Sequence, residues 1–170
     1  GLQPYTFGDI VTATNGEIYN YLELEESYGK DEHKSDCHIV GKVFAKEGIN
    51  TFSILKGMWA TIIYNKSTQE FTIGKDHLGI IPLYIGFGAN GEFYAASELK
   101  AIQHLCVRIE SMEPGHYIGN DLQIKRWYDP SWHHPEISIP SKIVEISEVH
   151  DALYKAVEIE LMGDVPFGIL

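Results

Sequence analysis

The chain has 170 residues, of which 44% are hydrophobic and 22% charged, as in an ordinary globular protein. This length suits one full domain and a little more. Its net charge of -11 at pH 7 argues against nucleic acid or an anionic membrane as the main partner. No apolar run approaches the roughly 20 residues of a membrane-spanning helix. Two cysteines, Cys37 and Cys106, are too few for a disulfide framework, which favours a reducing, cytoplasmic compartment.

The first element expected is a short strand over residues 9–14, which are rich in β-branched side chains. The Asn15-Gly16-Glu17 sequence then predicts a turn, because a helical pattern rather than a second strand follows it.

Two helices are expected next. Asn20 is predicted to cap the first helix, with Glu23 as its capping-box partner and Gly29 at its end. The second helix is predicted from Ser35 to about Gly48. Its apolar face is expected to consist of Ile39, Val40, Val43 and Phe44.

From residue 52 to residue 128 the pattern is that of β-structure. Six strands are expected: 58–64, 70–74, 83–87, 92–97, 116–119 and 122–128. Short turn signals such as Asn90-Gly91 and Asn120-Asp121 separate several of them, which favours antiparallel pairing. Helices early and strands late predict the α+β class.

The β-pattern ends at residue 128. Residues 129–146 carry three prolines and no clear period, as in a linker. Ser147 is expected to cap a final helix that Gly163 ends, with a strand entering at Asp164. We therefore predict a first domain over 1–128, a linker over 129–146 and the start of a second domain over 147–170.

Two groups of residues suggest a catalytic or ligand-binding site. A strand–turn–helix connection at Asn15-Gly16 would aim a side-chain amide and a backbone N–H at one point, as an oxyanion hole requires. The lack of a Cβ at Gly16 would let a ligand approach the backbone. A plain hairpin turn is the alternative. Glu17 and Asp36 could hold a ligand ammonium, but an acid such as Asp36 is also stabilised by the helix dipole alone.

The eight histidines show no ligand spacing with cysteines or carboxylates, so no metal site is expected. No aromatic–basic stripe suggests nucleic acid.

Five segments, taken in order, resemble the glutamine-hydrolysing asparagine synthetases and, more broadly, the class II (N-terminal nucleophile) glutamine amidotransferases. They are residues 15–20 (NGEIYN), 35–37 (SDC), 76–84 (DHLGIIPLY), 96–101 (ASELKA) and 164–170 (DVPFGIL). The sequence departs from the family pattern at His38, where a Glu is usual, and at Lys75, where an Arg is usual.

The resemblance implies an N-terminal-nucleophile αββα sandwich, in which two antiparallel sheets lie between helices, followed by the start of an α/β synthetase domain. It implies that Asn15 and Gly16 stabilise the oxyanion and that Glu17 and Asp36 hold the α-ammonium of glutamine. Asp76 reads as a hydrogen-bonded anchor rather than a catalytic group.

The family's nucleophilic N-terminal Cys and its pyrophosphate loop are expected to lie outside these 170 residues, so we expect the chain alone to release no ammonia from glutamine. Cys37 and Cys106 lack the free α-amino group that the nucleophile needs. The full-length protein is expected to use aspartate, ATP and Mg²⁺, with Leu170 near the nucleotide, and a homodimer is compatible with the resemblance. The alternatives are a synthetase with another acceptor, a non-catalytic or regulatory glutamine-binding homologue, and a partial product that does not fold alone.

Overall fold

A computed structural model describes residues 2–30, 35–134, 143–163, 166 and 168. The chain divides into two compact units, residues 1–129 and 130–170. The predicted strand begins at Asp164, which lies outside the described residues. The nucleotide contact was predicted at Leu170, which also lies outside them.

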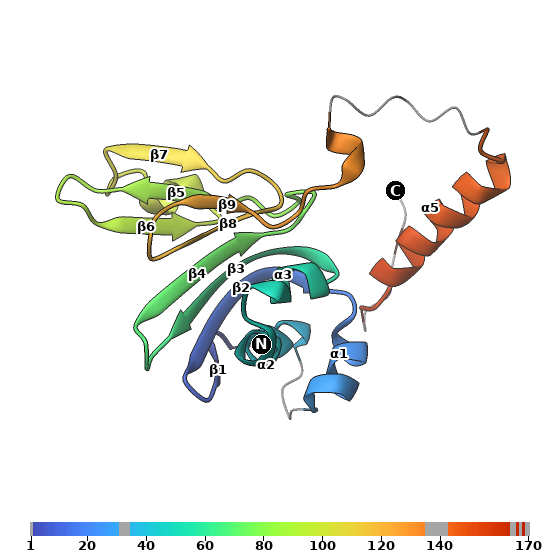
Figure 1. The fold of residues 1–170 in the computed structure, drawn as a ribbon, viewed down its shortest axis with the longest axis horizontal. Coiled ribbons are helices and arrows are strands. Elements are labelled where there is room, and N and C mark those ends of the chain that lie inside the picture. The colour runs from blue at the N-terminus through green and yellow to red at the C-terminus, as the bar shows by residue number, and fades with distance from the viewer. Residues whose placement is uncertain (1, 31–34, 135–142, 164–165, 167, 169–170) are drawn as a thin grey trace. The chain divides into compact units, whose positions relative to one another are not determined.

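The first unit contains a six-stranded antiparallel sheet in the order β1-β2-β3-β4-β8-β9 (Figure 1). Its strands are β1 (Tyr5–Phe7), β2 (Ile10–Ile18), β3 (Gly57–Asn65), β4 (Glu70–Lys75), β8 (His116–Gly119) and β9 (Ile124–Arg126). The β2–β3 pair is the longest, because its register runs unbroken from Ile10 opposite Asn65 to Ile18 opposite Gly57.

A second, three-stranded antiparallel sheet has the order β6-β5-β7. Its strands are β5 (Tyr84–Phe87), β6 (Phe93–Ala96) and β7 (Arg108–Ser111), and the short helix α4 (Leu99–Ile102) packs against it. Apolar side chains from both sheets and their flanks form one buried cluster, which consists of Ala60, Ile73, Leu83, Ile85, Met112 and Ile118. The Phe71 and Phe93 rings stack 5.4 Å apart across the two sheets.

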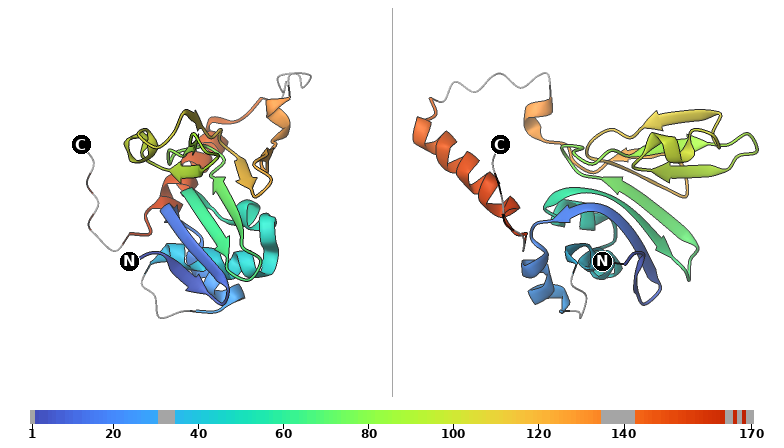
Figure 2. Two further views of the ribbon diagram at one scale, coloured as in Figure 1. Left: turned by 90° about the vertical axis from the view of Figure 1, so that its left-hand side faces the viewer. Right: turned by 180° about the vertical axis from the view of Figure 1, so that it is seen from behind.

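Helices cover the other face of the larger sheet, as Figures 1 and 2 show. They are α1 (Tyr21–Tyr28), η1 (Asp36–His38), α2 (Ile39–Glu47), η2 (Gly48–Asn50) and α3 (Thr51–Ile54). Their apolar side chains, with Ile18 and Trp59 from the sheet, form the other main core. The layers are therefore helix, sheet, sheet and helix, which confirms the predicted αββα fold.

Several local predictions are confirmed. The Asn90-Gly91 and Asn120-Asp121 signals lie in the β5–β6 and β8–β9 hairpins. Helix α1 ends at Gly29, and α2 ends at Gly48. Of the predicted apolar face of α2, Ile39, Val40 and Val43 are fully buried and Phe44 is partly buried.

The predicted capping box at Asn20 is wrong. Asn20 makes no side-chain hydrogen bond to the α1 N-terminus. Its Nδ2 donates to Ile54 O at 3.1 Å, and its Oδ1 accepts from Lys56 N at 2.9 Å. Asn20 thus ties the start of α1 to the segment between α3 and β3. The short strands β1 and β7 were not predicted, because three or four residues are too few to show a clear period.

The second unit contains η3 (Ser131–His133) and α5 (Ile146–Glu160). Helix α5 begins after Glu145, so Ser147 lies inside it and is not its N-cap, and it ends before Gly163. The assignment of residues 147–170 to a synthetase domain stays a prediction.

Candidate functional site

Residues Asn15, Gly16 and Glu17 lie within strand β2, so the predicted turn at this position is wrong. They pair with Ala60, Trp59 and Met58 of β3, respectively. The Asn-Gly pair suggested a turn because β3 lies about 40 residues further along the chain, and no local pattern indicates such a distant pairing.

Gly16 is required by the closeness of β3. Its φ is +133°, and a Cβ at this position would lie 2.0 Å from the Met58 backbone oxygen. Gly57 shows the reciprocal contact, since its Cβ would lie 2.0 Å from the Glu17 oxygen. The prediction that the missing Cβ of Gly16 makes room for a ligand is therefore wrong. The backbone of strand β3 occupies this space.

The side chains of β2 alternate between its two faces. Thr12, Thr14 and Ile18 are buried, whereas Asn15 and Glu17 are exposed. Asn15 borders a cavity of about 240 Å³, whose walls include Ala13 and Ala60 from the larger sheet and Leu83, Ala96 and Ser97 from the second sheet or its flanks. Asn15 thus lines a space between the two sheets.

The free edge of β2 beyond β1 is closed by side chains instead of a strand. Thr14 N donates to Gln3 Oε1, and Gln3 Nε2 donates to Thr14 O, both at 2.6 Å. Ile18 N donates to Asp36 Oδ2 at 2.6 Å. Between them, Gly16 O accepts from Cys37 Sγ at 3.4 Å.

Asp36 is the first residue of η1, and its carboxylate reaches the end of β2 through the bond to Ile18 N. Ser35 Oγ donates to its other oxygen at 3.4 Å. The sequence left open whether Asp36 and Glu17 converge. The fold brings the Asp36 carboxylate to the residue directly after Glu17, so the four predicted site residues gather at one end of β2.

Cys37 lies beside both acids, and its thiol is inert at neutral pH. Burial first of all, and then the negative charges of Asp36 and Glu17, together raise its pKa from 9.0 to about 12. A protonated thiol is a poor nucleophile. This agrees with the prediction that Cys37 is a buried structural residue.

Asp76 is fully buried, directly after strand β4, and it bonds the backbone of the neighbouring strand β3. Its Oδ1 accepts from three consecutive backbone N–H groups, those of residues 78–80, and its Oδ2 accepts from Ile81 N at 3.4 Å. Oδ2 also accepts from Trp59 N at 3.2 Å, while Asp76 N donates to Trp59 O at 2.8 Å. The predicted anchor role is confirmed. Its link to Trp59, which lies opposite Gly16, was not predicted, because sequence spacing carries no sign of it.

Lys75, at the second departure from the family pattern, is buried, and burial lowers its pKa while the nearby Asp76 charge raises it. Its Nζ donates to Met112 O at 3.2 Å. Lys75 therefore links the two sheets and does not enter the site.

Within the part of the chain that the structure describes, no three His, Cys, Asp or Glu residues gather in a way that could hold a metal ion. The same described residues contain no helix long and apolar enough to cross a membrane.

Residues 1–104 match the family described as "Glutamine amidotransferase domain". The chain belongs to this family, in agreement with its fold and with the gathering of Asn15, Gly16, Glu17 and Asp36.

Among curated proteins, the chain is similar to asparagine synthetase B [glutamine-hydrolyzing] of Escherichia coli (strain K12), with 36% identity over 94% of this chain and 29% of the relative. It is also similar to asparagine synthetase [glutamine-hydrolyzing] 2 of Arabidopsis thaliana, with 35% identity over 95% of this chain and 28% of the relative. The chain thus spans less than a third of the length of the curated relatives it matches.

Among solved structures, glutamine phosphoribosylpyrophosphate amidotransferase from B. subtilis, complexed with ADP and GMP, superposes with a TM-score of 0.62 at 22% identity, covering 75% of this chain and 32% of that chain. A structure described as the allosteric regulatory enzyme of purine biosynthesis gives 0.61 at 24% identity, covering 75% and 31%. At these identities the likeness concerns the fold alone.

Proposed function

We propose that this chain is the glutamine-binding part of a cytoplasmic, ATP-dependent amidotransferase that hydrolyses glutamine and uses the ammonia to convert aspartate to asparagine. The similarity to asparagine synthetases supports this assignment. The observation that carries it is that the Asp36 carboxylate bonds the end of β2, the strand that also carries Asn15 and Gly16. Asn15 also lines the cavity between the sheets.

In this proposal, Asn15 and Gly16 stabilise the oxyanion of glutamine hydrolysis. Attack on the side-chain amide of glutamine places negative charge on the former carbonyl oxygen, and two fixed N–H donors lower the energy of that state. The Asn15 amide borders the cavity, and the Gly16 N–H is the neighbouring donor on the same strand.

Glu17 and Asp36 are proposed to bind the α-ammonium of the ligand. An ammonium is a triple donor and pairs well with carboxylates by charge-assisted hydrogen bonds. Asp36 Oδ2 already accepts from Ile18 N, which fixes the orientation of this carboxylate before a ligand arrives.

The nucleophile is proposed to be an N-terminal cysteine of the full-length protein, since Cys37 is buried and protonated. Aspartate, ATP and Mg²⁺ are proposed substrates and cofactors of the full-length protein. If asparagine is the product, its formation by that protein will require both aspartate and ATP. Another acceptor in place of aspartate would identify a related synthetase.

Calorimetric titration of the 170-residue chain with L-glutamine tests the binding function. We expect Asp36→Asn to weaken binding about tenfold or more, as expected for a lost hydrogen bond to a charged group. Asp121→Asn, in the exposed β8–β9 hairpin, is the matched control and should bind like the unaltered chain. Equal binding by the Asp36→Asn variant would refute the role of Asp36, and no binding by the unaltered chain would refute the proposed site.

Ammonia release separates the enzyme from a regulatory homologue. The full-length protein should release ammonia from glutamine. If it binds glutamine and releases none, it is the non-catalytic homologue.

A further inference from the structure

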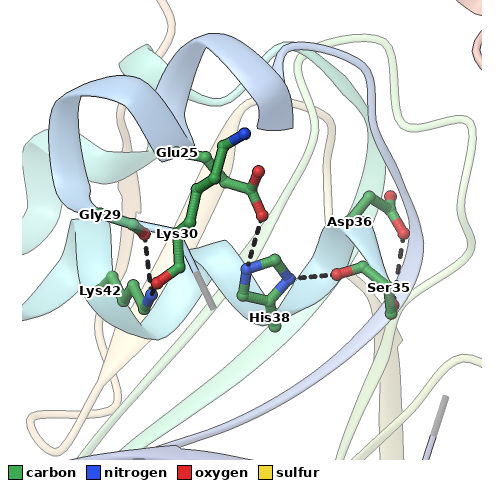
Figure 3. A network of polar contacts seen from close by, with 7 residues as sticks. All are labelled: Glu25, Gly29, Lys30, Ser35, Asp36, His38 and Lys42. Carbon is green, nitrogen blue, oxygen red and sulfur yellow. Dashed lines mark hydrogen bonds and ion pairs between the residues drawn. The ribbon is translucent and has the colours of Figure 1, made fainter. Parts of the chain in front are cut away.

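His38 occupies a buried position between helix α1 and the turn that carries Asp36, and only 4% of it is exposed. Its Nε2 lies 3.3 Å from Oε1 of Glu25, a buried residue of α1. Its Nδ1 contacts the backbone oxygen of Ser35. Figure 3 shows the imidazole between these two oxygens.

Both ring nitrogens therefore face hydrogen-bond acceptors. A neutral imidazole has a single N–H, so it can donate to only one of the two oxygens. His38 thus lies between α1 and the Ser35 carbonyl and contacts both.

The Ser35 carbonyl begins the turn that delivers Asp36 to β2. It also accepts from His38 N at 3.4 Å, so both the backbone and the ring of His38 hold it. Ser35 Oγ donates to Asp36 Oδ1 at 3.4 Å, and Asp36 Oδ2 accepts from Ile18 N at 2.6 Å. A displacement of the Ser35 carbonyl would therefore move the Asp36 carboxylate relative to β2.

We propose that His38 is a positioning residue that orients Asp36 for the α-ammonium of the amino-acid ligand, through its contact with the Ser35 carbonyl. This inference rests on the proposed glutamine-binding function. It gives a role to the position where the sequence departs from the family's usual Glu, with Glu25 as the acidic partner of the substituted histidine.

Two substitutions separate the contacts of His38. In His38→Asn the side-chain amide takes the place of Nδ1 and can still donate to the Ser35 oxygen, but it does not reach Glu25. In His38→Gln the longer side chain places its amide near the position of Nε2, so it keeps Glu25 and loses Ser35.

Lys42→Met provides the matched control. The buried Lys42 Nζ donates to Gly29 O at 2.8 Å and to Lys30 O at 3.1 Å, so Lys42 also joins α1 to α2, and Figure 3 shows it in the same network. Both of these acceptors lie at the C-terminal end of α1, outside the turn that carries Asp36.

The experiment compares calorimetric affinities of the 170-residue chain for L-glutamine and for glutaramate, which lacks the α-amino group. The ratio of the two affinities reports the ammonium contact specifically, and a general loss of stability does not change it. We expect His38→Gln to reduce the ratio about tenfold, the effect of one hydrogen bond to a charged group. We expect His38→Asn and Lys42→Met to keep the ratio, even where thermal melting shows that they are less stable.

An unchanged ratio in His38→Gln would overturn the proposal, as would a comparable fall of the ratio in Lys42→Met. A fall in His38→Asn equal to that in His38→Gln would overturn the assignment to the Ser35 contact. If the unaltered chain does not bind L-glutamine at all, the proposed function itself fails, which is a different result from binding with an unchanged ratio.

Discussion

Replacing Gly16 with alanine tests the close approach of β2 and β3 at the site. The added methyl group would lie 2.0 Å from the Met58 oxygen and 2.8 Å from Trp59 Cα, and real Cβ atoms essentially never approach within 3.0 Å. Both contacts are with backbone atoms, so no side chain can rotate away to relieve them. The strands must separate, or the backbone of residue 16 must change.

The expected loss in the free energy of unfolding has two parts. A non-glycine residue in a left-handed conformation costs roughly 1–2 kcal/mol, and overpacking against fixed atoms costs about 1–3 kcal/mol. We therefore expect Gly16→Ala to lower the free energy of unfolding by roughly 2–5 kcal/mol, out of a total of about 5–15 kcal/mol for a domain. Gly8→Ala isolates the first part, because Gly8 has a φ of +57° and no atom within 4 Å of an added Cβ.

Urea unfolding followed by tryptophan fluorescence measures both variants, since the buried Trp59 lies directly opposite Gly16. The slope of the transition should be unchanged if both variants unfold from the same native state. A Gly16→Ala variant within 1 kcal/mol of Gly8→Ala would refute the argument from strand proximity.

Three further predictions concern groups around the site. Asp76→Asn should lower the free energy of unfolding, measured by urea titration, by about 3 kcal/mol. The reason is that an amide NH₂ group would face backbone N–H donors in a fully buried position. A loss below about 1 kcal/mol would contradict the anchor role. Asn20→Asp should cost about 1–2 kcal/mol by the same titration, since it loses the donor to Ile54 O, whereas no loss would restore the capping explanation. Cys37, whose pKa is raised to about 12, should react with iodoacetamide at pH 9 only after unfolding, and rapid labelling of the folded chain would contradict its burial. Since the unfolded thiol has the lower pKa, near 9.0, the contribution of Cys37 to stability is present below pH 9 and falls as the pH rises toward 12; Cys37→Ala should therefore flatten this part of the pH–stability curve.

The local sequence pattern was sufficient to predict an element where the residues that contact one another are also close in the sequence. The apolar face of α2 was predicted from residue spacing, since helical periodicity places Ile39, Val40 and Val43 together. The Asn90-Gly91 hairpin was predicted because the turn residues themselves provide the positive φ that the hairpin needs, +89° at Gly91.

Predictions failed where a distant segment decides the conformation. Asn20 has the residue type of a helix cap, yet its amide bonds a loop that lies 34 and 36 residues further on. Strand β7 has no clear period, but pairing with β5 gives its four residues a ladder of backbone bonds. Neither partner can be identified from spacing alone.

The sequence by itself determined that the chain carries the residue types of a glutamine site, including Asn15, Gly16, Glu17 and Asp36, because these lie in short motifs. Tertiary structure decided how they act together: the Asn-Gly pair belongs to a strand, and Gly16 is glycine because Met58 leaves no room for a side chain. It also decided that Asp36 meets the end of β2, because its carboxylate accepts from Ile18 N. The physical reason is that backbone pairing and steric contact depend on which segments meet, and the 38 residues from 19 to 56 separate β2 from β3, the strand that defines its geometry.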